Sequence, residues 1–159
     1  MDLTLLSGAT AGAAAGAAGC AALDATTYLD MTIRGRPASD VPAETADALV
    51  KHLPVQLPGQ NSQRKNRLNG IGGLSGVLTG VGVGAAFGLL HGSGWRPPPA
   101  VGAVAVGIGA MLVSDSTLAG LRVSDPRTWS VTDWLSDLIP HLVYGTVTYA
   151  TLVALEGRR

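Results

Sequence analysis

Four long stretches of this sequence contain almost no charged residues, and the charged residues are concentrated between them. A helix needs roughly 20 mainly apolar residues to cross about 30 Å of hydrocarbon. A soluble helix made from such a stretch would be apolar on every side. The pattern therefore predicts an all-α fold, an integral membrane bundle of four transmembrane helices in a single domain of residues 1–159. The predicted spans cover approximately residues 3–28, 70–92, 98–121 and 133–155.

The composition agrees with this prediction. Hydrophobic residues make up 47% of the chain and charged residues only 14%, whereas a soluble domain has about 25% charged residues. The formal net charge is zero and no basic face stands out, which argues against nucleic acid as a partner. Cys20 is the only cysteine, so the chain can form neither an internal disulfide nor a metal site made of cysteines.

The first apolar stretch has an alternative interpretation as a cleaved signal peptide, because residues 17–20 faintly resemble a lipoprotein cleavage box. A signal peptide begins with a positively charged segment. Here the segment before the apolar stretch is Met1 and Asp2, without Lys or Arg. We therefore interpret this stretch as a span.

Basic residues in the connections predict the direction of the helices. The two long connections carry eight of them, namely Arg34, Arg36, Lys51, Arg64, Lys65, Arg67, Arg122 and Arg127. The opposite side carries only Arg96, Arg158 and Arg159. Since short loops rich in Lys and Arg stay in the cytoplasm, we expect both termini outside. Three tryptophans flank the predicted spans, where aromatic rings rest at the level of the headgroups: Trp95, Trp129 and Trp134.

Glycines form regular rows along two of the predicted spans. The second span has a glycine at every fourth position, at Gly72, Gly76, Gly80, Gly84 and Gly88. The first span repeats this spacing at Gly8, Gly12 and Gly16. Residues four apart share one face of a helix, and contact between small-residue faces is a principal source of packing energy in lipid. The rows predict Gly-xxx-Gly packing, either within the chain or with a second copy.

The loop between the first two spans, residues 34–69, contains one further helical pattern. Ala46, Leu49, Val50 and Leu53 fall at helical spacing, and charged residues occupy the other faces. This pattern predicts an amphipathic helix over residues 42–53, lying on the membrane or on the bundle.

Ionisable residues inside the predicted spans are candidate functional groups, because burying them in lipid is costly. With the predicted topology Asp24, Asp115 and His141 all lie toward the cytoplasmic side, and Tyr144 follows His141 on the same span. Histidine changes charge near neutral pH, so one interpretation is a proton or polar site. The other is that hydrogen bonds from these residues tie the helices together.

No enzyme signature is present. The sequence lacks a zinc-binding His-Glu-x-x-His pair, a phosphate-binding glycine loop and a Gly-x-Ser-x-Gly turn. We therefore expect no catalytic residues, no cofactor and no metal. The leading hypothesis is a non-enzymatic structural or accessory subunit that packs through its glycine faces with itself or with a larger membrane complex. The alternative is a small proton-linked transporter or channel that uses the Asp and His residues.

The C-terminal half shows a further pattern. A Gly- and Ala-rich span is followed by a short loop with Asp125 and Trp129, and then by a span that contains Asp137, His141 and Tyr144 near its start. This order resembles the YagU-like family of small bacterial inner-membrane proteins. The resemblance implies a multi-span protein of the bacterial plasma membrane, and it supplies no catalytic residue.

Overall fold

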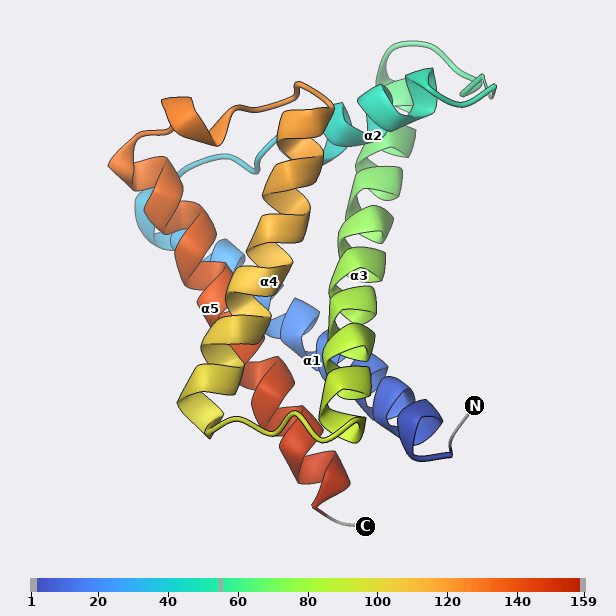
Figure 1. Cartoon of the computed structure of the whole chain (residues 1–159). Coiled ribbons are helices and arrows are strands. Elements are labelled where there is room, and N and C mark those ends of the chain that lie inside the picture. Colours follow the sequence, from blue (N-terminus) through green and yellow to red (C-terminus); the bar gives the residue numbers. More distant parts are fainter. Residues whose placement is uncertain (1–2, 55, 158–159) are drawn as a thin grey trace.

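The computed structural model describes residues 3–54 and 56–157, and in these ranges it contains five α-helices and no strand (Figure 1). In chain order the elements are α1 (Leu3–Arg34), α2 (Val41–Lys51), α3 (Ser62–Gly92), α4 (Pro99–Gly120), the 3-10 turn η1 (Pro126–Thr128) and α5 (Val131–Glu156). Four helices, α1, α3, α4 and α5, are long and apolar enough to cross a membrane. The predicted all-α chain with four candidate spans is confirmed at this level.

Two of the helices continue beyond the predicted span ends. The first span was predicted to end at residue 28, but α1 continues to Arg34, and α3 begins at Ser62 instead of residue 70. The 32 residues of α1 are about 48 Å long at 1.5 Å per residue, which exceeds the hydrocarbon thickness. Helical hydrogen bonding does not stop where the apolar residues stop, so both helices carry polar turns past the apolar stretch.

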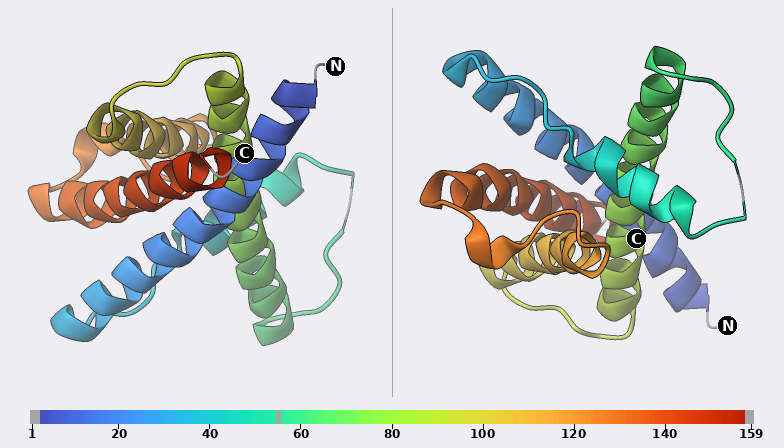
Figure 2. Two further views of the ribbon diagram at one scale, coloured as in Figure 1. Left: turned by 90° about the horizontal axis from the view of Figure 1, so that it is seen from below. Right: turned by 90° about the horizontal axis from the view of Figure 1, so that it is seen from above.

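The helices alternate in direction. Figure 1 shows the start of α1, the end of α5 and the turn between α3 and α4 at one end of the bundle, which we name the terminal end. The connections at residues 35–54, 56–61 and 121–130 lie at the opposite end, which we name the loop end. Figure 2 shows α1 crossing α3 at a steep angle, whereas α4 and α5 run side by side. The most extensive contacts are α1 with α3, α1 with α5, and α4 with α5.

The crossing of α1 and α3 brings two backbones into direct contact. A Cβ atom placed on Gly12 would lie 2.8 Å from the Cα of Gly88, and one on Gly84 would lie 2.7 Å from the Cα of Gly16. Ordinary Cβ contacts begin at about 3.4 Å. Any side chain at these positions would therefore push the two helices apart.

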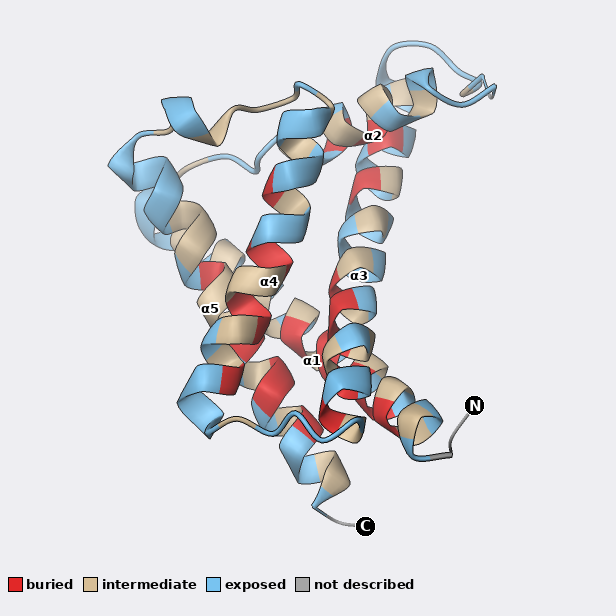
Figure 3. Cartoon of the chain, viewed as in Figure 1, coloured by how far each residue is buried: buried red, intermediate tan, exposed pale blue. Residues whose placement is uncertain are grey.

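Helix α5 fits between α1 and α4 in the same close manner. A Cβ atom on Gly145 would lie 2.7 Å from the Cα of Gly107 on α4. Two turns further along α5, Leu152 is fully buried and packs with Ala11 and Ala15 of α1. Figure 3 shows the buried residues along the inner seams of the bundle, with exposed residues over most of the outer surface.

Helix α2 lies on α3 at the loop end. Its buried residues are Ala43 and Ala46, which pack against Leu68 of α3. The predicted amphipathic helix over 42–53 is thus observed as Val41–Lys51, but Leu49 and Leu53 of the predicted apolar face are exposed. Alanines pack on α3 because their short side chains allow α2 to lie close to its surface.

An ion-pair group fixes the outer side of α2. The carboxylate of Asp47 pairs with Lys51 one turn later, at 2.7 Å, and with Arg64 of α3. Hydrogen bonds from Lys51 and Arg64 hold the pKa of the Asp47 carboxyl below its usual range. The pairing therefore persists across the neutral pH range and joins the loop to the bundle.

Candidate functional site

A polar group lies between α4 and α5, within the loop-end half of the bundle. Ser114 and Asp115 come from α4, and Asp137 and His141 come from α5. The imidazole Nδ1 of His141 lies 2.8 Å from the backbone oxygen of Asp137 and 3.3 Å from its carboxylate Oδ1. The other ring nitrogen, Nε2, lies 3.4 Å from the hydroxyl of Ser114. We name these four residues the Asp-His group.

The two carboxyl groups of the Asp-His group are incompletely hydrogen-bonded. Asp115 is buried, with 9% of its surface exposed. Its Oδ1 atom and the Oδ2 atom of Asp137 are buried without a hydrogen-bond partner. A buried acceptor without a donor costs about 1–3 kcal/mol. A proton on either carboxyl would supply a donor, so the arrangement can hold a proton beside the imidazole.

The local sequence explains how α5 comes this close to α4. Gly107 faces the backbone of α5, where a Cβ atom would lie 2.6 Å from the carbonyl oxygen of His141. Pro140 stands inside α5 and has no N–H, so the carbonyl of Ser136 loses its usual helix partner. The absence of a side chain at Gly107 therefore allows His141 to lie against α4.

Two of the four predicted polar residues lie elsewhere. Asp24 is exposed on α1, and no hydrogen bond or ion pair of the described residues joins it to Asp115 or His141. Tyr144 is buried, and its hydroxyl donates to the backbone oxygen of Gly80 on α3 at 2.6 Å. Asp115 and His141 are brought together, Asp24 is separate, and Tyr144 ties α5 to α3.

The predicted glycines occupy different surroundings. Gly8, Gly12 and Gly16 of α1 face the backbone of α3 at Gly80, Gly84 and Gly88. Gly72 faces Pro42 of α2, and Gly80 also faces Cys20 and Tyr144. A Cβ atom on Gly76 would meet nothing within 4 Å. One regular row in the sequence thus meets three different partners and, at Gly76, open space.

Sequence reasoning missed an ionic contact at the terminal end. The imidazole Nδ1 of His91, at the end of α3, is bonded to Oε2 of Glu156, at the end of α5. Arg96 lies 3.7 Å from the same carboxylate oxygen, and the ring of Tyr149 stands edge-on to the imidazole. The available signal was an ionisable residue at the end of each of two spans, predicted to lie at the same membrane face.

Among the described residues, no three His, Cys, Asp or Glu side chains are grouped so as to hold a metal ion. Comparisons of the chain with family models, with curated proteins and with solved structures found no match. The resemblance of the C-terminal half to the YagU-like family stays a prediction.

Proposed function

We propose that this chain is a non-enzymatic membrane protein, a structural or accessory subunit that associates through a glycine-containing helix face with a second copy or with a larger membrane complex. The observation that supports this proposal best is the low burial of α3. Only 22% of the residues in the most apolar part of α3 are buried, against 33% in each of the other three spans. Helix α3 therefore leaves more of its residues available for contact with another protein than the other spans do.

The glycine contacts between α1 and α3 bear on which face is used. Gly12, Gly16 and Gly84 meet glycine backbones of the same chain, so this part of the row serves the fold of the single chain. The part of α3 nearer the loop end stays open, because a Cβ atom on Gly70, Gly73 or Gly76 would meet nothing within 4 Å, and we name this part of the surface the open face. Small residues allow close helix approach in lipid, and we place the intermolecular contact on this open face.

Substitution of one glycine on α3 and one on α4 tests this assignment. Gly76→Leu places a bulky side chain on the open face and leaves the contact of α1 with α3 intact. We expect it to abolish co-purification of differently tagged copies or of partner proteins, while the folded chain remains stable in detergent. Gly120→Leu is the matched control, because this glycine of α4 also faces open space. Unchanged association of Gly76→Leu would refute the proposal.

The orientation is part of the same proposal. We place the protein in the bacterial plasma membrane with the loop end in the cytoplasm and both termini outside, since the loop end carries most of the basic residues. Single cysteines in the Cys20→Ser background test this orientation. A cysteine at Ser62 should be protected from a membrane-impermeant thiol reagent in whole cells, and one at Ser93 should be labelled. The opposite result would invert the orientation.

A second candidate function is proton-linked transport through the Asp-His group. The unpartnered oxygens of Asp115 and Asp137 beside His141 support it, because such a group can load and release a proton. In liposomes, His141→Ala and Asp115→Asn should abolish proton flux if this candidate is right. His52→Ala, an exposed histidine on the loop beyond α2, is the control. Undiminished flux in both variants would exclude the candidate.

A further inference from the structure

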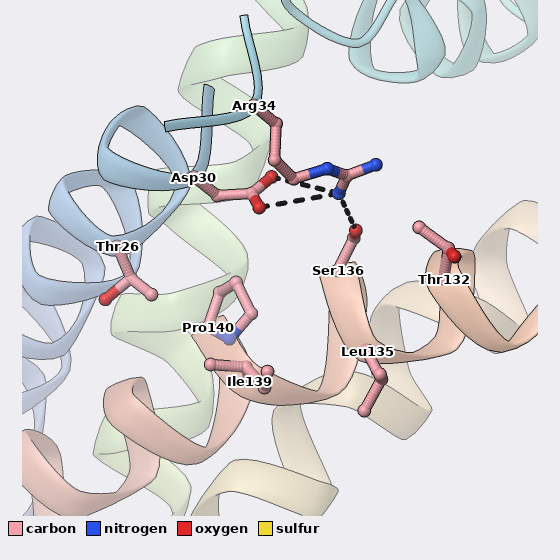
Figure 4. A pocket seen from close by; sticks show the side chains of 8 residues that line it. All are labelled: Thr26, Asp30, Arg34, Thr132, Leu135, Ser136, Ile139 and Pro140. Atoms are coloured by element: carbon pink, nitrogen blue, oxygen red, sulfur yellow. Dashed lines mark hydrogen bonds and ion pairs between the residues drawn. The ribbon is translucent and has the colours of Figure 1, made fainter. Parts of the chain in front are cut away.

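A cavity of about 270 Å³ lies between the C-terminal half of α1 and the N-terminal half of α5 (Figure 4). Its polar side is formed by Asp30 and Arg34 of α1 and Ser136 of α5, and its apolar side includes Ile139 and Pro140. Small-molecule pockets enclose roughly 300–1,000 Å³, so this space fits part of a longer molecule. Ile139 is 49% exposed, which leaves the apolar side open toward the surroundings of the bundle.

The polar side carries donors for an anion. Nη1 of Arg34 lies 2.8 Å from the hydroxyl oxygen of Ser136 and 3.4 Å from the carboxylate of Asp30. Nε of Arg36 lies 2.5 Å from the same carboxylate. Two guanidinium groups thus share the carboxylate of Asp30, and Asp133 of α5 also interacts electrostatically with Arg34. The side chain of Arg34 is 40% exposed, so its remaining N–H groups can reach a ligand.

The polar and apolar sides of the cavity lie in the same order along α5 as the headgroup and hydrocarbon regions of a bilayer. Trp129 and Trp134 stack edge to face, with ring centroids 5.1 Å apart, at the start of α5, where tryptophan marks the headgroup level. Ser136 lies within two turns of that level. Ile139 follows it by three residues, or about 4.5 Å deeper along the helix. The charged groups therefore face the headgroup region, and the apolar groups face the hydrocarbon.

We propose that this cavity binds one glycerophospholipid, whose phosphodiester accepts hydrogen bonds from Arg34 and Ser136 and whose acyl chain lies along Leu135, Ile139 and Pro140. A phosphodiester carries one negative charge, which the half-exposed guanidinium group of Arg34 attracts. Arginine with a neighbouring hydroxyl is a strong donor set for phosphate oxygens. A lipid in this place would fill the cavity between α1 and α5.

Native mass spectrometry of the detergent-purified chain tests this proposal, with phosphatidylglycerol of defined acyl length added in increasing amounts. We expect Arg34→Ala to weaken lipid binding about tenfold, because it removes the charged donor. Arg34→Lys should retain most of the affinity. Arg127→Ala is the matched control, since this loop-end arginine is 89% exposed and pairs only with Asp125 among the described residues. Equal lipid binding by Arg34→Ala and Arg127→Ala would overturn the proposal.

A second variant blocks the cavity while it keeps the ion pair of Arg34 with Asp30. Ser136→Leu keeps the pairing of Arg34 with Asp30 and fills the cavity, so it should also lower lipid binding about tenfold. Millimolar inorganic phosphate should not displace the lipid, because it lacks the acyl chain. If phosphate displaces the lipid fully, or if Ser136→Leu binds lipid like the unaltered chain, the site does not hold a phospholipid.

Discussion

The crossing of α1 and α3 makes a sharp prediction for Gly84→Ala. The added Cβ atom would lie 2.7 Å from the Cα of Gly16, where ordinary contacts begin at 3.4 Å, a shortfall of 3.4 − 2.7 = 0.7 Å. The neighbouring atoms belong to backbone and cannot rotate away, so the helices must separate. Extra methyl groups in a close-packed interior destabilise by about 1–3 kcal/mol. A gap of about 0.5–1 Å also forfeits a quarter to a half of each dispersion contact along the crossing.

Gly76→Ala on the same helix is the matched control for this prediction. Its Cβ atom would meet nothing within 4 Å, and both variants gain the same intrinsic helix propensity from alanine. The difference in free energy of unfolding between the two variants therefore isolates the contact, and we expect Gly84→Ala to be less stable by about 1–3 kcal/mol.

Reversible unfolding in mixed detergent and dodecyl sulfate micelles, followed by circular dichroism, measures both variants under the same conditions. If Gly84→Ala and Gly76→Ala are both as stable as the unaltered chain, α1 and α3 do not approach each other closely at Gly84. A loss in both variants would show instead that the open side of Gly76 is covered in the folded protein.

Three further predictions use the same micelle system. Tyr144→Phe should lower the free energy of unfolding by about 0.5–1.5 kcal/mol through loss of one buried hydrogen bond, whereas Tyr28→Phe, at an exposed position, should have no effect. Glu156→Ala should destabilise by about 1–3 kcal/mol because its histidine partner stays buried; an equal effect of Glu44→Ala, at an exposed position on α2, would contradict this. Because the pKa of Asp47 is lowered in the folded chain, its contribution is present above the usual carboxyl pKa and is lost as pH falls through the folded value. The protection factor of the α2 amides, which is the intrinsic exchange rate at each pH divided by the observed rate, should therefore stay constant from about pH 8 to 5 and fall below about pH 4, and a fall already near pH 6 would refute this assignment.

The sequence was sufficient for the features that depend on local composition. A bilayer selects for long apolar stretches, and each stretch can satisfy its backbone hydrogen bonds alone as a helix. The four spans could therefore be predicted segment by segment. The helix ends at Arg34 and Ser62 were missed, because both helices continue into polar sequence beyond the apolar stretch. A change in hydropathy marks the end of the apolar stretch and not the end of the helix.

The tertiary structure decided which faces meet. Spacing alone assigns Gly76 and Gly84 to the same row of one helix, but the steep crossing with α1 covers Gly84 and leaves Gly76 open. Similarly, the sequence offered Asp24 and Asp115 equally as partners of His141. Only the antiparallel packing of α4 on α5 brings Ser114 into contact with His141 and the neighbouring Asp115 into electrostatic interaction with it. The periodicity of a helix fixes which residues share a face. The partner of that face depends on rotations and crossing angles set by all the helices together.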